Sequence, residues 1–278
     1  MKYIHRKIQG YKDFDIFSKA HDNGRNILLK GPTGSAKTMV GSSYSKENSY
    51  PLAVVPCSHA TDPGSLFGRY TPKEGEDFFE WTDGVITELV RKPGKKVLIL
   101  DEVNMADPKI MASLFSLLDS NKTLNLIDHN EVIKVEDLLV IATMNPGYRG
   151  TRDLNKALAN RFAYTFYWDY DTHVESTICP SPSFLKCVTK IRESGDSDTP
   201  FSTNMIIEFI EANKEFNFEF ALEMIGNKYD RDESQGIMQV FKQHKTDIIR
   251  ELSRKKDSKG RAKPIRGSHN YNWSGIDT

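Results

Sequence analysis

The residues of this chain that could do chemistry begin with the stretch GPTGSAKT, which directly follows an apolar run at residues 26–30. Its members are, in order, Gly31, Pro32, Thr33, Gly34, Ser35, Ala36, Lys37 and Thr38. Except at Ala36, they match the phosphate-binding pattern G-x-x-x-x-G-K-[ST]. The N–H groups and the dipole at the start of a helix bind polyphosphate. We expect Lys37 to reach the β- and γ-phosphates and the Thr38 hydroxyl to hold Mg²⁺.

Ala36 replaces the last glycine of this pattern, at the position where the helix begins. Alanine is a good helix former, so the sequence predicts no backbone strain there, provided that its Cβ points away from the phosphates.

Two further polar groups follow apolar runs. Asp101 and Glu102 end the run at residues 96–100, and Asn145 ends the run at residues 138–144. In an open α/β fold, ligands bind at the edge where strands end. We expect Asp101 to hold Mg²⁺ through water, Glu102 to polarise an attacking water, and Asn145 to orient that water.

The elements that must position these groups alternate in type. Short apolar runs at residues 26–29, 52–57, 96–100, 138–144 and 163–168 are separated by helical patterns. This alternation predicts an α/β fold with a parallel five-stranded sheet and helices on both faces. The stretches DFFEWTDG and TLNLIDHNEVIKV interrupt it, and we interpret them as a small hairpin or insertion and a hairpin.

The remainder of the chain differs in character. We predict an α/β domain at residues 1–170, a small helical domain at 171–252, and a basic, flexible tail at 253–278. Three amphipathic stretches and one shorter helix at 184–191 form the helical domain. The tail holds seven basic and two acidic residues. It could be solvated, bind nucleic acid, or dock on a partner through Tyr271 and Trp273.

Composition excludes several classes of protein. Lys plus Arg and Asp plus Glu are both 38, so the net charge gives no argument for nucleic acid. The three cysteines form no C-x-x-C pair, which favours neither a disulfide framework nor a zinc site. The polar start of the chain is unlike a signal peptide, and no apolar run reaches membrane-spanning length. We expect a cytoplasmic protein.

Together, the loop, the Asp-Glu strand end and the Asn-Pro strand end resemble the AAA+ ATPases, and within them the MoxR-type branch. The stretches LDEVNMADPKIMASLFSLLD and ATMNPGYRGTRDLNKALANRF are similar to the CbbQ and NorQ activators and their cobalt-chelatase and dynein-like relatives. The resemblance covers residues 27–220. MoxR-type loops also carry alanine at the third glycine position, so the resemblance implies a working ATP site.

The resemblance implies roles for matching positions. Gly31, Gly34, Lys37 and Thr38 match Walker A, Asp101 and Glu102 match Walker B, and Asn145 matches sensor 1. Arg161 matches the arginine finger that reaches a neighbour's γ-phosphate; the alternative is a helix-end arginine on the surface. Arg149 and Arg152 are weaker candidates. The helical domain matches the family's lid, where Asn204 stands in place of the sensor 2 arginine.

The function implied is that of an ATP-hydrolysing, Mg²⁺-dependent ring subunit, a hexamer, that remodels a protein partner. The partner could be a von Willebrand factor A domain protein, and in this family the two hairpins face the ring's pore or its client. One alternative is an McrB-like motor subunit that acts on DNA with a nuclease. Another is an assembly scaffold with little hydrolysis.

Overall fold

The computed structural model describes residues 3–58, 60–73, 75, 78–146, 154, 156–195 and 199–253, and the backbone of 255–256 and 262–263. The chain divides into two compact units, Met1–Asp171 and Thr172–Thr278. Each unit contains one short antiparallel pair of strands. In the first unit β1 (Lys7–Ile8) pairs with β2 (Tyr11–Lys12), and in the second β12 (Lys255–Lys256) pairs with β13 (Ala262–Lys263).

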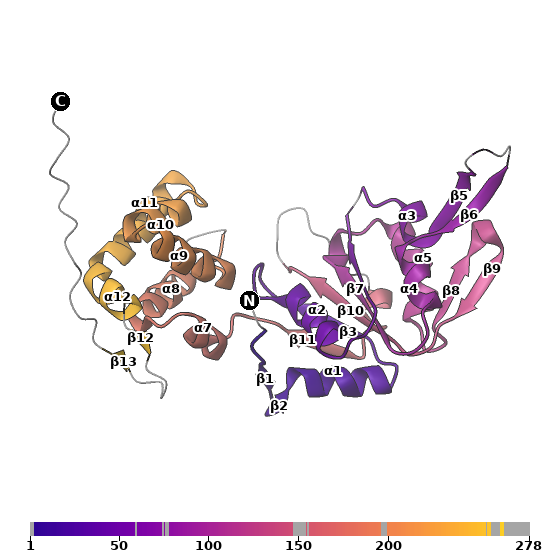
Figure 1. Ribbon diagram of the computed structural model, residues 1–278, viewed down its shortest axis with the longest axis horizontal. Coiled ribbons are helices and arrows are strands. Elements are labelled where there is room, and N and C mark those ends of the chain that lie inside the picture. Colours follow the sequence, from indigo (N-terminus) through magenta and orange to yellow (C-terminus); the bar gives the residue numbers. More distant parts are fainter. Residues whose placement is uncertain are drawn as a thin grey trace. The chain divides into compact units, whose positions relative to one another are not determined.

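A five-stranded parallel sheet forms the centre of the first unit (Figure 1). In spatial order its strands are β11 (Tyr164–Tyr167), β3 (Ile27–Lys30), β10 (Leu138–Met144), β7 (Lys96–Asp101) and β4 (Leu52–Pro56). Each of the five apolar runs named above coincides with one of these strands to within one residue at either end. The predicted α/β fold with a parallel five-stranded sheet is therefore confirmed.

Helices cover both faces of this sheet. The helices of the first unit are α1 (Asp13–Asp22), α2 (Lys37–Glu47), α3 (Pro63–Phe67), α4 (Val85–Arg91), α5 (Pro108–Leu118) and α6 (Lys156–Ala159). Successive side chains of a strand point to opposite faces. Thus Ile27 and Leu29 pack with α1 and α2, whereas Leu28 packs in the core that includes α4 and α5. The central strands are buried on both faces, which explains their continuous apolar sequences.

Two antiparallel hairpins extend from this unit (Figure 1). One pairs β5 (Gly68–Pro72) with β6 (Phe79–Asp83), and the other pairs β8 (Thr123–Leu126) with β9 (Glu131–Lys134). The first begins earlier than the stretch DFFEWTDG suggested, because Gly68 already pairs with Asp83. The Trp81 ring stacks on His129 with centroids 4.5 Å apart, so an aromatic contact joins the two hairpins.

The second unit is helical. It contains α7 (Thr172–Ile178), α8 (Pro182–Ser194), α9 (Thr203–Glu215), α10 (Phe218–Gly226), α11 (Arg231–Gln243) and α12 (Lys245–Leu252). Helix α8 is longer than predicted, and its N-cap Ser181 accepts a hydrogen bond from the Phe184 N–H. The last amphipathic stretch, predicted as one helix, is broken at His244. The break lets Phe241 and Ile248 enter the same core, where both are fully buried.

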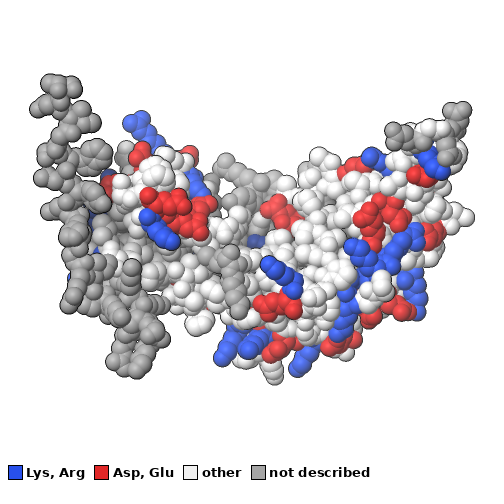
Figure 2. All heavy atoms as spheres, viewed as in Figure 1, with Lys and Arg blue, Asp and Glu red and all other residues white. Residues whose placement is uncertain are grey.

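Surface charge is mixed. On the face shown in Figure 2, acidic and basic side chains lie next to one another over both units. Among the described residues, no helix is long and apolar enough to cross a membrane.

Candidate functional site

The loop at residues 31–36 connects the carboxyl end of β3 to α2. The chain then passes from β3 to β4 at the far edge of the sheet, and later from β10 to β11 on the other side of β3. The connections that leave the neighbouring strands β3 and β10 run in opposite directions, so the carboxyl edge between them is a topological switch point, where open α/β sheets bind ligands.

Two positions of the loop, Gly31 and Gly34, require glycine for structural reasons. A Cβ built on Gly31 would lie 2.1 Å from the backbone oxygen of Trp168, at the end of β11, so no side chain fits. Gly34 has a φ of 72°, in the left-handed region that glycine adopts without strain. The loop therefore depends on glycine at both positions.

Ala36 contradicts the prediction made for it. It is the N-cap of α2 and has φ 67° and ψ 30°, which is left-handed rather than helical backbone. Helix propensity does not apply to a residue in this conformation, and a Cβ there costs about 1–2 kcal/mol relative to right-handed backbone. The alanine fits the loop, but with strain that glycine would avoid.

Lys37, the first residue of α2, folds back over the loop. Its Nζ donates hydrogen bonds to the carbonyl oxygens of Gly31 at 3.0 Å and Pro32 at 2.7 Å. Burial lowers the pKa of Lys37 to about 8, although the carboxylates of Asp101 and Glu102 act to raise it. The ammonium is thus held within the loop by neutral acceptors that an anion could replace.

Asp101, at the end of β7, accepts two short hydrogen bonds on one oxygen. Thr38 Oγ1 and Thr143 Oγ1 each donate to Asp101 Oδ1 at 2.6 Å. Thr143 is fully buried in β10 and also accepts the backbone N–H of Glu102 at 3.0 Å. The predicted Walker A threonine and Walker B aspartate are therefore in direct contact, and Thr143 is a site residue that the sequence pattern did not identify.

Glu102 and Asn145 also meet. Glu102 has a left-handed φ of 54°, and its Oε1 accepts a hydrogen bond from Asn145 Nδ2 at 3.0 Å. Asn104 Nδ2 donates to the carbonyl oxygen of Asn145 at 3.3 Å. Among the described residues, the buried Oδ1 of Asn145 accepts no hydrogen bond. It can accept one from a molecule bound beside Glu102.

Two residues outside the motif support the loop. The guanidinium of buried Arg6 donates to the carbonyl oxygens of Ser35 and Asp169, both at 2.6 Å, and lies 4.7 Å from the centre of the Trp168 ring. The Tyr170 hydroxyl donates to the Thr33 carbonyl oxygen at 2.9 Å. No local pattern could reveal them, because Arg6 and Asp169 are 163 positions apart.

Arg161 lies away from these groups. It precedes β11 and its backbone oxygen accepts a hydrogen bond from Asn26, which precedes β3. Arg161 is therefore at the amino edge of the sheet, at least about 13 Å from the carboxyl edge for a four-residue strand. Its Nη1 donates to the Ala157 carbonyl at 2.7 Å, and its Nε lies 2.7 Å from Asp119 Oδ1 without the alignment of a hydrogen bond.

The other predicted positions are less informative. Arg149 and Arg152 lie outside the described residues, as do Tyr271 and Trp273. Asn204 is exposed in the first turn of α9, in the second unit, and its role stays a prediction. Within the part of the chain that the structure describes, no group of three or more His, Cys, Asp or Glu could hold a metal ion.

Comparisons with known proteins identify similar sequences and structures. Residues 26–162 match the family model of the AAA domain, dynein-related subfamily. An uncharacterized protein of Staphylococcus aureus strain USA300 is 38% identical over 189 residues, which cover 64% of this chain and 71% of the relative. An uncharacterized protein of strain MRSA252 matches equally well. A crystal structure of a candidate ATPase from Cytophaga hutchinsonii has a TM-score of 0.45 at 16% identity, over 84% of this chain and 80% of the other.

Proposed function

The chain belongs to the AAA family, in its dynein-related subfamily, and we propose from this that it is an ATP-hydrolysing ring subunit that remodels a protein partner. Its finer place in the MoxR-type branch, near CbbQ and NorQ, is part of the proposal. The observation that carries the proposal is the contact of Thr38 with Asp101 beside the contact of Glu102 with Asn145.

The loop supplies the phosphate site in this proposal. Its N–H groups and the start of α2 favour negative charge. Lys37 leaves the carbonyls of Gly31 and Pro32 when a phosphate offers stronger, charged acceptors. Arg6 and Tyr170 hold the carbonyls of Ser35 and Thr33, which limits the rearrangement that binding would require.

Thr38 and Asp101 fit a magnesium ion by the chemistry of their donor atoms. A hydroxyl and a carboxylate oxygen already converge within 2.6 Å, and Mg²⁺ prefers few protein oxygens together with water and substrate phosphates. When bound, the ion would neutralise charge on the phosphates. Thr38 and Asp101 are the residues that would hold it.

Hydrolysis requires a water placed against the γ-phosphate. Glu102 is the candidate general base, because its carboxylate is fixed by Asn145 at the same edge as the loop. The buried Oδ1 of Asn145 has no other partner among the described residues and could accept a hydrogen bond from that water. The Asn145 side chain would thus orient both the general base Glu102 and the attacking water.

The place of Arg161 supports the proposal of a ring. An arginine at the amino edge of the sheet cannot reach the loop at the carboxyl edge of its own chain. It can serve a site only on a neighbouring subunit, which is the arrangement of an arginine finger supplied in trans. We propose a hexamer, with the two hairpins facing the client and a von Willebrand factor A domain protein as the partner class.

The test is Mg²⁺-dependent phosphate release from ATP by the full chain, measured over a range of protein concentrations. Specific activity should rise with concentration as subunits assemble. Lys37→Ala should abolish ATP binding and release, whereas Lys46→Ala, in the last turn of the same helix, should behave as the parent protein. Phosphate release that persists in Lys37→Ala, or a parent protein that binds no ATP, would contradict the proposal.

A further inference from the structure

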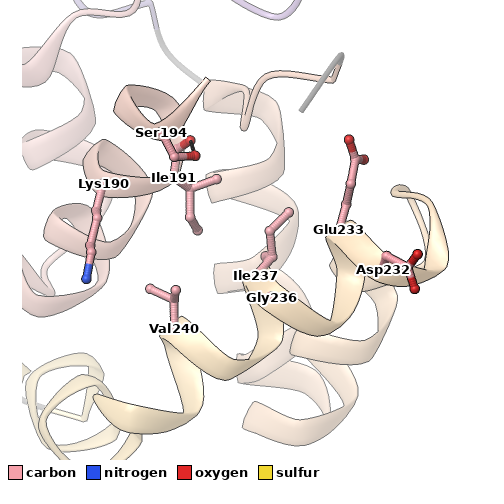
Figure 3. A pocket seen from close by; sticks show the side chains of 8 residues that line it. All are labelled: Lys190, Ile191, Ser194, Asp232, Glu233, Gly236, Ile237 and Val240. Carbon is pink, nitrogen blue, oxygen red and sulfur yellow. Dashed lines mark hydrogen bonds between the residues drawn. The ribbon is translucent and has the colours of Figure 1, made fainter. Parts of the chain in front are cut away.

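A groove lies between α8 and α11 in the helical unit (Figure 3). Its cavity of about 340 Å³ is within the size range of sites that take a large side chain or small ligand. Ile191 of α8 and Ile237 and Val240 of α11 provide its apolar lining. None of the residues in the proposed nucleotide site belongs to this unit, so the groove requires a separate explanation.

Gly236 keeps the groove open. It lies in α11 between Glu233 and Val240, one turn from each, on the face that lines the cavity. A Cβ built on Gly236 would meet nothing within 4 Å. Glycine in a helix interior costs stability relative to alanine, by about 0.8–1.0 kcal/mol. The chain thus carries a destabilising residue at the position where a side chain would narrow the groove.

The groove has opposite charges at its two ends. Asp232 and Glu233 lie at one end, and Lys190 extends at the other, as Figure 3 shows. An occupant that matches this pattern has an apolar side chain in its middle, a basic residue on one side and an acidic residue on the other.

We propose that the occupant is the end of the same chain, residues 266–277. This segment has Arg266 at its start, Trp273 in its middle and Asp277 at its end, which is the order that the groove requires. Trp273 enters the cavity, Arg266 pairs with Asp232 and Glu233, and Asp277 pairs with Lys190. Tryptophan suits this role because it buries a large area and commonly anchors interfaces.

The same chain can reach its own groove. Glu251, near the end of α12, accepts hydrogen bonds from Ser181 and Ser183 at the start of α8. From Ser183 to Ile191 along α8 is about 12 Å at 1.5 Å per residue. Because β12 and β13 pair antiparallel, the chain returns at Lys263 to the neighbourhood of Lys255, and the ten residues from there to Trp273 can extend to roughly 33 Å. Length therefore allows docking within one molecule, with slack to adjust its path.

Fluorine NMR of the full chain labelled with 5-fluorotryptophan tests the proposal. The chain has three tryptophans, and Trp273→Phe assigns the signal of interest. We expect that signal to be displaced from the position of free indole and to show no H₂O/D₂O isotope shift. Gly236→Leu, which fills the groove, should return it to the free position. Gln239→Leu, on an exposed part of the same helix, is the matched control and should change nothing.

A charge exchange gives a second, independent reading. Glu233→Lys should release the Trp273 signal in part, and adding Arg266→Glu should restore its displacement. A Trp273 signal at the free position in the parent protein overturns the proposal, as does a displaced signal that ignores Gly236→Leu. Displacement that depends on protein concentration would mean docking between copies and would overturn docking within one chain. None of these variants touches Lys37 or Glu102, so the outcome is independent of ATP hydrolysis.

Discussion

In the phosphate loop, the alanine at position 36 occupies left-handed backbone, a conformation that glycine adopts with less strain. Ala36→Gly should raise the free energy of unfolding by about 0.5–1 kcal/mol, since relief of about 1–2 kcal/mol outweighs the extra entropy that glycine loses. Urea unfolding followed by tryptophan fluorescence measures this, because Trp81 and Trp168 lie in the same unit. Ser43→Gly, in the interior of α2, should instead destabilise. A loss of stability in both variants would contradict the left-handed conformation.

Lys37 makes nucleotide affinity depend on pH. Burial lowers its pKa to about 8, and a bound polyphosphate favours the charged form and raises that pKa. Below the lower pKa the ammonium is already charged, so affinity is constant; above it, binding must also take up a proton. The dissociation constant for ATP should therefore rise by up to about tenfold per pH unit from about pH 8.

Calorimetry from about pH 7.5 to about pH 9.5, on a Glu102→Gln background that stops turnover, measures this dependence. Lys37→Arg should bind without the rise, because a guanidinium stays charged over this range. A dissociation constant of the lysine protein that stays flat to the upper limit would show that Lys37 does not carry the charge that binds phosphate.

At the scale of elements, the segment before α1 braces the loop after β3. Arg6 donates to the carbonyls of Ser35 and Asp169, and Asp13 accepts the Arg6 backbone N–H at 2.9 Å. Arg6→Met keeps most of the side-chain volume but leaves two carbonyls without this donor. Hydrogen bonds to charged groups contribute about 1.5–3 kcal/mol, so ATP affinity should fall about tenfold or more.

Titration of the Arg6→Met protein with ATP, beside Tyr170→Phe, checks this brace. Tyr170→Phe removes a neutral, exposed hydrogen bond to Thr33 and should cost less than about threefold in affinity for ATP. Equal affinity of Arg6→Met and the parent protein would mean that the loop holds its shape without Arg6.

The elements that the sequence predicted are those that local physics determines. Strands β3, β7 and β10 are apolar on both faces, so a continuous apolar run marks each of them. The contact of Asp101 with Thr38 could be anticipated because Asp101 ends one parallel strand and Thr38 follows the carboxyl end of another. The left-handed φ of Ala36 could not be anticipated, because the geometry of the loop before α2 overrides helix propensity at that residue. The contacts of Arg6 with the loop could not be anticipated either, since its partners are far away in the sequence.

At the scale of the whole molecule, the proposed role of Arg161 in trans would make catalysis a property of two subunits. Arg161→Ala should bind ATP as the parent protein does but hydrolyse it poorly. Mixing it with Lys37→Ala should restore part of the activity, because a Lys37→Ala subunit can offer an intact Arg161 to a neighbour's intact loop. Phosphate release across mixing ratios measures this, with mixed assemblies verified by native mass spectrometry. Mixed assemblies without any rescue would rule out action in trans.

The most direct test of the account is Glu102→Gln, assayed for ATP binding and for phosphate release in the same preparation. Glutamine keeps the shape of the side chain and leaves Thr38, Asp101 and the loop unchanged, but it cannot take a proton from water. We predict parent-like affinity for ATP and a rate of phosphate release lower by at least about a hundredfold, within the usual contribution of a general base. A glutamine protein that releases phosphate at the parent rate would contradict the assignment of Glu102, and with it the proposed mechanism of hydrolysis.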